Sequence, residues 1–299
     1  RCQREGRGFK SHCPLQKIFV KMIIWISSYP KSGNTYIRSF LSAYYFSKDG
    51  NFNFNLLLNI NQFPGIHFSK NKMDSKLEAS KNWILNQNIY FDKNKLNILK
   101  THNSLTAYEQ NKFTSKDQTL GAIYICRDPR NVITSLKNHY SMDYDKALNF
   151  MLNDSSSLTQ NSIDKDFSNF TFLGSWSNHY KSWKNNKIFP TMFIRYEDLQ
   201  DNKFEIFKEI IFFINNLSKN NDSINEKKLL NSINSTNFIN LKNMEQSKGF
   251  EESIISKKTG KKIRFFNMGF NNRWQKILPE EIKIKTNKVF KEDLKVLNY

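Results

Sequence analysis

The sequence predicts an α/β fold built on a mainly parallel β-sheet. Four short apolar runs have the length and composition of buried strands, and segments with helical periodicity lie between and after them. Short strands that alternate with helices are typical of this fold class. The predicted strands are Ile23–Ser27, Leu96–Lys100, Leu120–Cys126 and Met192–Arg195.

The segments that follow the predicted strands carry apolar residues at helical spacing. The first predicted helix, Asn34–Phe46, begins directly after a turn signal. The same spacing predicts further helices around Val132–Leu136, around Leu173–Trp183, over Lys203–Asn215 and over Glu280–Leu297. Residues 47–95 and 215–265 are polar and are predicted to be irregular. No internal repeat or linker stands out, so residues 22–299 are predicted to form a single domain.

The first 21 residues differ in composition from the rest of the chain. They hold six basic residues against the single acid Glu5, together with two of the three cysteines. They lack an apolar stretch of signal-peptide type, so we expect a non-native or disordered leader that ends before Met22. Cys126 is then the only cysteine, which excludes an intramolecular disulfide and favours a reducing, cytoplasmic location.

The net charge of +19 makes nucleic-acid binding one function class to test. Lys supplies 37 of the 46 basic residues in an Asn-rich chain, so much of the basicity reflects composition. The dense basic cluster from Lys257 to Arg264 is short and does not define a nucleic-acid face. We therefore expect no specific nucleic-acid partner. No stretch of about 18 apolar residues occurs, so no transmembrane segment is expected either.

The segment Tyr29–Tyr36, with the sequence YPKSGNTY, joins a predicted strand to a predicted helix. Unpaired N–H groups at a helix N-terminus attract anions, and Gly33 permits close approach of the backbone. Lys31 adds a charge, and Ser32 and Thr35 add hydroxyl donors. The segment departs from the GxxxxGK[ST] pattern, which disfavours an ordinary ATPase or kinase loop. A polar turn with a helix cap is the alternative.

A second strand-to-helix junction spans Cys126–Ser135. Asp128 suits the cap position of the helix, and Pro129 suits its first turn. Arg127 and Ser135 are placed to hold one phosphate between a guanidinium and a hydroxyl. The alternative is that Arg127 pairs with Asp128 or with a neighbouring carboxylate. The carboxyl edge of a parallel sheet, where ligands of α/β proteins bind, favours the phosphate interpretation.

Together, YPKSGNTY and RDPRNVITS resemble the motifs of the cytosolic-type, 3′-phosphoadenosine-5′-phosphosulfate-dependent sulfotransferase family, and the chain resembles a bacterial-like member of it. The usual forms are YPKSGTTW and R-x-P-x-D-x-x-x-S. The resemblance continues through Lys100-Thr101-His102 (K-T-H), Tyr196-Glu197-Asp198 (Y-E-D) and Thr236-Asn237-Phe238 (T-x-F). Asn267–Trp274 resembles the family's C-terminal R-K-G-x-x-G-x-W. The resemblance to the family as a whole covers most of residues 22–299.

The resemblance implies a P-loop-NTPase-like three-layer α/β sandwich and 3′-phosphoadenosine-5′-phosphosulfate as the sulfuryl donor. It implies that Arg127 and Ser135 hold the 3′-phosphate, and that Tyr36 takes the place of the usual Trp beside adenine. The donor-binding residues it implies are Lys31, Ser32, Gly33, Asn34, Thr35, Tyr36, Arg127, Ser135, Tyr196, Thr236, Phe238, Gly269 and Arg273. Asn34 replaces a Thr of the first motif. Asn267 and Met268 replace an Arg-Lys pair, for which Arg273 or Arg264 is the candidate substitute.

The family's K-T-H motif implies that His102 is the catalytic base, assisted by Lys31 and Lys100. Sulfuryl transfer would then proceed by in-line attack of a hydroxyl or amine on sulfur, with no metal required. The other histidines, His67, His139 and His179, lack such a context and are interpreted as core or surface residues. Trp176 and Trp183 are interpreted as core.

The acceptor is a small molecule that the motifs do not identify. Aromatic residues in the segment that often forms the acceptor pocket in this family hint at an aromatic or apolar alcohol; these residues are Phe52, Phe54, Phe63, His67 and Phe68. No dimer signature is recognisable, so monomer and homodimer both stay open. The alternative functions are a P-loop-like nucleotide kinase, a catalytically degenerate nucleotide-binding protein and a basic nucleic-acid-binding protein.

Overall fold

The computed structural model describes residues 23–299, apart from 70–72, 74, 93–94, 163–166 and 257–259. Residues 1–22 lie outside the described residues, and the expected leader lies there with them. Among the described residues, no helix is both long and apolar enough to span a bilayer.

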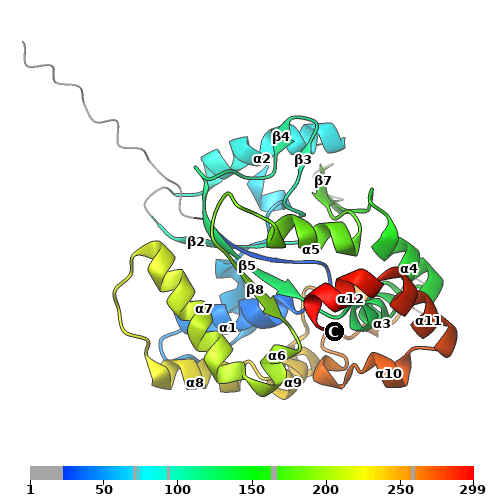
Figure 1. Cartoon of the computed structure of the whole chain (residues 1–299). Coiled ribbons are helices and arrows are strands. Elements are labelled where there is room, and N and C mark those ends of the chain that lie inside the picture. The colour runs from blue at the N-terminus through cyan, green and yellow to red at the C-terminus, as the bar shows by residue number, and fades with distance from the viewer. Residues whose placement is uncertain (1–22, 70–72, 74, 93–94, 163–166, 257–259) are drawn as a thin grey trace, which may run out of the picture.

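The centre of the molecule is a four-stranded parallel sheet (Figure 1). Its strand order is β2-β1-β5-β8, and the register pairs Trp25 with Leu99 on one side and with Ala122 on the other. The strands are β1 (Ile23–Ser28), β2 (Asn97–Thr101), β5 (Thr119–Cys126) and β8 (Thr191–Arg195). All four predicted strands are confirmed, and no predicted bound differs from the observed one by more than one residue.

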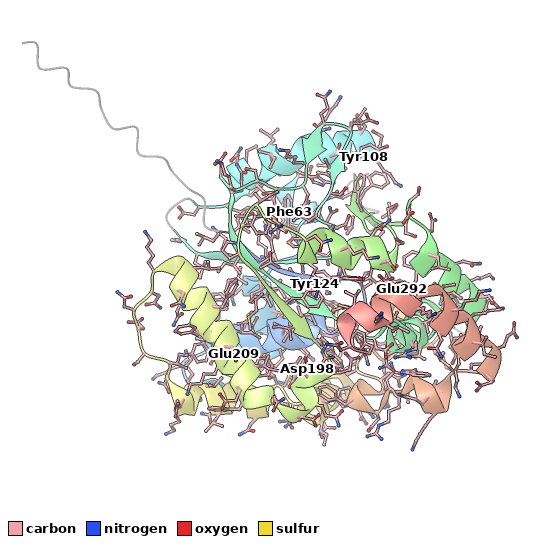
Figure 2. The ribbon with its side chains drawn as sticks, viewed as in Figure 1. Phe63, Tyr108, Tyr124, Asp198, Glu209 and Glu292 are labelled. Carbon is pink, nitrogen blue, oxygen red and sulfur yellow. The ribbon has the colours of Figure 1, made fainter. Side chains whose placement is uncertain are left out.

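Side chains on the two faces of the sheet enter two separate hydrophobic cores. In β1, Trp25 faces one core while Ile24 and Ile26 face the other, because successive strand residues point to opposite faces. The Trp25 core also contains Tyr124, which is 1% exposed and labelled near the centre of Figure 2. Helices cover both faces, which confirms the predicted three-layer α/β arrangement.

Three helices with large apolar faces cover the Ile24 side of the sheet: α1 (Asn34–Phe46), α7 (Lys203–Ser218) and α8 (Glu226–Ser235). The Trp25 side is covered by α2 (Lys76–Tyr90), α3 (Pro129–Tyr140), α4 (Tyr144–Leu152), α5 (Trp176–Lys184), α11 (Glu280–Val289) and α12 (Lys291–Leu297). Figure 1 shows α1 and α7 on one side of the sheet and α5 on the other. Trp176 and Trp183 of α5 are buried, as predicted.

Smaller elements complete the described part of the chain. Three two-stranded antiparallel pairs lie outside the main sheet: β3 (Ala107–Tyr108) with β4 (Asn111–Lys112), β6 (Ser157–Ser162) with β7 (Phe167–Phe172), and β9 (Ile254–Ile255) with β10 (Lys262–Ile263). The short helices are η1 (Phe54–Asn59), η2 (Ile66–Phe68), α6 (Asp198–Asp201), η4 (Gly269–Asn271) and α10 (Trp274–Ile277). A further helix, α9 (Phe238–Lys248), precedes β9.

The prediction that residues 47–95 and 215–265 are irregular is wrong. The first segment contains α2, which Ser75 caps by accepting a hydrogen bond from the Glu78 N–H. The second contains α8 and α9, which are capped in the same way by the side chains of Asn225 and Asn237. These Asn residues suggest loops by composition, yet here they satisfy the free N–H groups that begin a helix.

The predicted helix over Glu280–Leu297 is divided in two. Phe290, which is 1% exposed, lies at the junction of α11 and α12. Its ring contacts Trp176 of α5 with a centroid distance of 5.2 Å, so the chain bends where this side chain enters the core. The helix predicted around Leu173–Trp183 is α5, which begins only at Trp176. Ser175 caps it, so Leu173 lies before the helix.

Candidate active site

The carboxyl ends of the parallel strands lead into one cavity of about 310 Å³. This edge of the sheet is where the β1–α1 loop, the end of β2 and the β5–α3 junction meet, as parallel topology requires. All but three of the sequence-predicted site residues line the cavity: Lys31, Gly33, Asn34, Thr35, Tyr36, Lys100, His102, Arg127, Ser135, Tyr196, Phe238 and Gly269.

The β1–α1 loop takes its shape from Lys31 and Gly33, whose φ angles are 66° and 100°. A Cβ atom on Gly33 would lie 2.3 Å from Cδ2 of Tyr196, so only glycine lets this ring pack against the loop. The Asn34 amide donates to the Ile26 carbonyl over 3.0 Å and to the Ser28 hydroxyl over 3.3 Å. Asn34 therefore ties the start of α1 back to β1.

Lys31 places an ammonium group against the cavity wall. Its Nζ lies 3.9 Å from the centroid of the Phe265 ring. Burial lowers the pKa of Lys31 to about 7, an effect that Glu252 opposes and that Lys100 and Arg127 reinforce. The amine is therefore poised between its charged and neutral forms near neutral pH, and an anion in the cavity would favour the charged form.

His102 follows β2 and is fixed by backbone atoms. Its Nδ1 lies 2.8 Å from the Ser28 carbonyl oxygen, which can only accept, so Nδ1 carries the proton and Nε2 carries the lone pair. The His102 carbonyl in turn lies 3.0 Å from Nε2 of His179, which is buried in the core beside Tyr124. Burial, together with the charge of Lys100, lowers the pKa of His102 to about 3. The imidazole is thus neutral and available as a base.

Arg127 lies at the end of β5 with its guanidinium on the cavity wall. Nη1 donates to the Lys31 carbonyl over 3.1 Å and lies 3.5 Å from the Ser135 hydroxyl, while Nη2 donates to the Gly269 carbonyl over 3.3 Å. The residue is 7% exposed, and its Nε has no hydrogen-bond partner. The guanidinium packs over the Tyr196 ring at 4.5 Å.

The alternative pairing of Arg127 with Asp128 is not what the structure shows. Asp128 instead binds Arg130, which donates to its two carboxylate oxygens over 2.8–3.2 Å. Asp128 also accepts from the Arg130 N–H and so caps α3, with Pro129 in the first turn as predicted. Among the described residues no ion pair to Arg127 is found, so its charge is available to a ligand.

Aromatic rings form one side of the cavity. Tyr196 stacks on Phe270 with a centroid distance of 4.9 Å, and Tyr36 meets Phe270 edge-on at 6.4 Å. The φ of Gly269 is 56°, and a Cβ there would lie within 2.8 Å of the Phe238 ring. Such flat faces, next to a buried guanidinium, suit a planar heterocycle that carries a phosphate.

Three predicted site residues lie outside the cavity lining. Ser32 is fully buried, and its hydroxyl oxygen has no partner. Thr236 is also fully buried, and its hydroxyl donates to the Ser232 carbonyl over 2.6 Å. Arg273 lines a neighbouring hollow with Glu197 and Trp274. The structure therefore gives Thr236 a role in the turn before α9 and places the Arg273 side chain away from the cavity.

Comparison with known proteins decides the family. The model of the sulfotransferase domain family matches residues 21–298. The chain belongs to the sulfotransferase family. Sulfotransferase 1A1 of Rattus norvegicus is 30% identical over 118 residues, a match that covers 39% of this chain and 37% of the rat protein. The match thus spans well under half the length of that relative.

Two solved structures share the fold of this chain. Mouse sulfotransferase SULT7A1, complexed with PAP, superposes with a TM-score of 0.56 over 92% of this chain and 85% of its own, at 20% identity. Retinol dehydratase, in a complex with retinol and PAP, superposes with a TM-score of 0.54 over 91% and 81%, at 16% identity. These likenesses establish the sulfotransferase fold of this chain, including its central parallel sheet.

This sulfotransferase-family chain departs from the usual C-terminal motif at two positions that both line the cavity, Asn267 and Met268. Of the two candidate replacements for the missing charge, Arg264 lines the cavity and Arg273 does not. Of the two, Arg264 is therefore the one that stays a candidate for that charge.

Sequence reasoning missed several cavity residues of this sulfotransferase-family chain. Glu252 is the most important, because its carboxylate accepts from Thr35 over 3.1 Å, from Arg38 over 2.7 Å and from Lys100 over 3.0 Å. Burial alone would raise the pKa of Glu252, yet Lys100 and Arg38 hold it far below its usual range. Phe270 is a second omission. Glu252 lies in none of the motifs, and Phe270 stands at a position that the C-terminal motif leaves unspecified, so neither residue was singled out.

The interpretation of His139 as core or surface is incomplete, because His139 lines the cavity. Conversely, the aromatic residues expected around the acceptor do not line it. Phe63 and Phe68 pack with Trp25 and Phe113 in one core, while Phe52 and Phe54 pack in the other. Among the other side chains that line the cavity are Gln62, His139, Tyr140, Leu158, Phe265 and Phe266.

Proposed function

We propose that this chain transfers a sulfuryl group from 3′-phosphoadenosine-5′-phosphosulfate to a hydroxyl or amine of a small-molecule acceptor. The observation that carries the proposal is the environment of Arg127, a buried guanidinium beside Ser135 whose Nε lacks a partner. Arg127 lies next to the loop that begins α1 and would hold the 3′-phosphate of the donor. ADP and ATP lack this phosphate. The PAP bound in both solved relatives supports the same donor.

The residues present fit the two ends of this nucleotide. The 3′-phosphate end matches Arg127 and Ser135, whose spare donors suit a phosphate oxygen. The 5′ end matches the N-terminus of α1 with Lys31 and Thr35, where N–H groups and positive charge converge. The adenine suits the aromatic faces of Tyr36, Tyr196, Phe238 and Phe270.

The donor, when bound, supplies the sulfuryl group and the leaving phosphate. His102 accepts the proton of the attacking hydroxyl or amine at Nε2, because Nδ1 is held by the Ser28 carbonyl. The anionic donor raises the pKa of this imidazole above its value in the free protein, which makes His102 a stronger base. Lys31 and Lys100 lie on the same cavity and supply positive charge for the phosphate that leaves.

The acceptor enters beside His102, where the wall combines rings with a few polar groups. Tyr140, Leu158 and Phe265 offer apolar surface, and Gln62 and His139 offer hydrogen-bonding atoms. This composition supports an aromatic or apolar alcohol as the acceptor. We further propose that residues 22–299 act as a single, cytoplasmic sulfotransferase domain.

The experiment compares the binding of 3′-phosphoadenosine-5′-phosphate and ADP by thermal shift and calorimetry. The bisphosphate is expected to raise the melting temperature far more than ADP, because ligands that bind the folded state stabilise it. In Arg127→Met its affinity is expected to fall about 10- to 100-fold, the effect of losing a charge-assisted hydrogen bond. The ADP affinity is expected to stay unchanged.

The exposed Lys288, on α11, provides a matched control. Lys288→Met removes one positive charge from a residue outside the cavity lining and is expected to bind both nucleotides as the unaltered chain does. Equal affinity of the unaltered chain for both nucleotides contradicts the donor assignment and favours a kinase-like site.

A further inference from the structure

The carboxylate of Glu252 occupies an anion-binding pocket in the wall of the cavity. We call Thr35, Arg38 and Lys100 the oxyanion pocket, because each donates to that carboxylate over 2.7–3.1 Å. Thr35 and Arg38 lie in the first turns of α1, and Lys100 lies in β2. Glu252 itself comes from the turn between α9 and β9, far away in the sequence.

The oxyanion pocket has more binding capacity than one carboxylate uses. Arg38 and Lys100 are two cations facing a single negative charge, and the Nε of Arg38 has no hydrogen-bond partner. Arg38 as a whole is 8% exposed, so water does not readily satisfy that donor. A buried guanidinium with a spare N–H, next to the N-terminus of a helix, suits an anion with more oxygens and more charge.

The same pocket overlaps the 5′ end of the proposed donor. Thr35 and Lys100 both line the cavity beside Lys31, and both now bind Glu252. Two anions within a few ångströms of each other in a buried site repel strongly. The Glu252 carboxylate and the phosphosulfate of the donor therefore compete for the same positive charges.

From this competition, and resting on the proposed function, we propose that Glu252 is a displaceable carboxylate that the phosphosulfate replaces. Once Glu252 has moved away, the N–H groups of Arg38 are free to bind the phosphosulfate of the donor. Glu252 sets the affinity for the donor, because every binding event must first break its ion pairs.

The geometry shows which partner moves. The side chains of Arg38 and Lys100 are 9% and 6% exposed and belong to the wall, whereas that of Glu252 is 26% exposed and opens to the cavity. Glu252 follows Gly249, whose φ is 75°, and lies in the turn closed by the Ser253 N–H and the Phe250 carbonyl. A rotation of this side chain releases the oxyanion pocket without disturbing α1 or β2.

The alternative is a fixed role, in which Glu252 stays in place and only holds Lys100 and Arg38. The two roles predict opposite effects of Glu252→Gln, which keeps the shape of the side chain and removes its charge. A displaceable carboxylate weakens donor binding, so its removal tightens binding. A fixed carboxylate orders the cations, so its removal leaves binding unchanged or weaker.

The test measures the affinity for 3′-phosphoadenosine-5′-phosphate by calorimetry, with melting temperatures as the check on folding. We expect Glu252→Gln to bind it at least tenfold more tightly than the unaltered chain. Adenosine 3′-monophosphate, which lacks the 5′ group, is expected to bind the unaltered chain and Glu252→Gln with equal affinity. Glu251→Gln, a change at the exposed neighbouring carboxylate, is expected to have no effect.

A second pair of proteins tests Arg38. In the Glu252→Gln background, Arg38→Met is expected to weaken binding of the bisphosphate at least tenfold, because Arg38 then contacts the nucleotide and no longer serves Glu252. Should Glu252→Gln fail to fold, Glu252→Asp, whose shorter side chain reaches the pocket less well, is expected to tighten binding in the same direction.

Unchanged or weaker binding of the bisphosphate by a folded Glu252→Gln protein overturns the inference. If Arg38→Met leaves the affinity of the Glu252→Gln protein for the bisphosphate unchanged, Arg38 does not bind the donor. If neither the unaltered chain nor Glu252→Gln binds the bisphosphate, the donor assignment itself fails. If both bind it with the same affinity, the donor assignment stands and only the role of Glu252 fails.

Discussion

At the scale of single residues, the proposed sulfuryl transfer depends on which nitrogen of His102 carries the proton. The 2.8 Å contact with the Ser28 carbonyl fixes the proton on Nδ1 and leaves Nε2 as the basic atom. Burial and Lys100 together keep this imidazole neutral in the free protein, with a pKa of about 3. Its basicity thus depends on the negative charge that the donor brings.

The first prediction concerns His102→Gln. Gln can still donate to Ser28 but cannot take up a proton, so the kcat of sulfuryl transfer is expected to fall by about 100- to 10,000-fold. Binding of 3′-phosphoadenosine-5′-phosphate is expected to change less than about twofold. The assay uses any phenol or amine that the unaltered chain sulfates in a screen with labelled donor.

His67→Gln, a substitution of an exposed histidine, serves as its control and is expected to keep the original kcat. Near-normal turnover of His102→Gln would remove His102 from the mechanism.

The second prediction concerns the protonation of Lys31. Its pKa is about 7 in the free protein, and an anionic nucleotide raises it by favouring the charged amine. At pH 8 the free amine is mostly neutral and the bound amine is charged, so binding of 3′-phosphoadenosine-5′-phosphate takes up close to one proton. The affinity for this ligand therefore falls as the pH rises above 7.

Calorimetry at pH 8 in two buffers of different ionisation enthalpy measures this uptake. In Lys31→Arg the side chain stays charged throughout, so both the proton uptake and this pH dependence are expected to vanish. An affinity that rises between pH 7 and pH 9 would contradict the assignment of Lys31 to the phosphosulfate end.

Where a motif follows a strand, the sequence predicted which residues lie at the cavity. Lys31, His102 and Arg127 each lie just beyond a predicted strand, so parallel topology brings them to one edge. Glu252 lies outside every motif, and Phe270 lies at an unspecified position of the C-terminal one, so the side chains that reach the cavity there depend on tertiary packing.

At the scale of elements, the β5–α3 junction fixes the position of Arg127. Asp128 caps α3 and binds Arg130, and their side chains are only 6% and 10% exposed. The sequence predicted both the cap and the proline after it. By contrast, α2, α8 and α9 were missed because their Ser and Asn caps are the residues that also favour loops.

The third prediction is made for this junction. Asp128→Ala removes the cap of α3 and leaves the Arg130 guanidinium buried without its carboxylate. The free energy of unfolding is expected to fall by about 3–5 kcal/mol, the usual effect of breaking a buried ion pair. Urea denaturation, with an unchanged m value, measures the loss.

Asp143→Ala provides the comparison, because Asp143 caps α4 in the same way but its side chain is 57% exposed. The free energy of unfolding of Asp143→Ala is expected to fall by about 1 kcal/mol. If the two variants lose the same free energy of unfolding, the buried pair with Arg130 does not stabilise the junction.

At the scale of the whole molecule, the cavity exists because four parallel strands end at one edge between two hydrophobic cores. The alternation of side chains along β1 sends Trp25 into one core and Ile24 into the other, which holds the helices on both faces. The fold class was predictable because this pattern is local. The division of residues 280–297 at Phe290 was not, because it depends on contact with Trp176.

The net charge of +19 belongs to this scale as well. The positive charges at the cavity are few: Lys31, Lys100, Arg127 and Arg264 line it, and Arg38 lies behind them. Among the described residues, Arg38 and Lys100 form ion pairs with one carboxylate at the cavity, that of Glu252. The rest of the excess is a general field that attracts an anionic nucleotide.

The most direct measurement is a crystal structure of the chain with bound 3′-phosphoadenosine-5′-phosphate. We expect the 3′-phosphate within hydrogen-bonding distance of the Arg127 guanidinium and the Ser135 hydroxyl, and the 5′-phosphate at the N-terminus of α1 beside Lys31. A nucleotide bound in the opposite direction, or outside this cavity, would contradict the account.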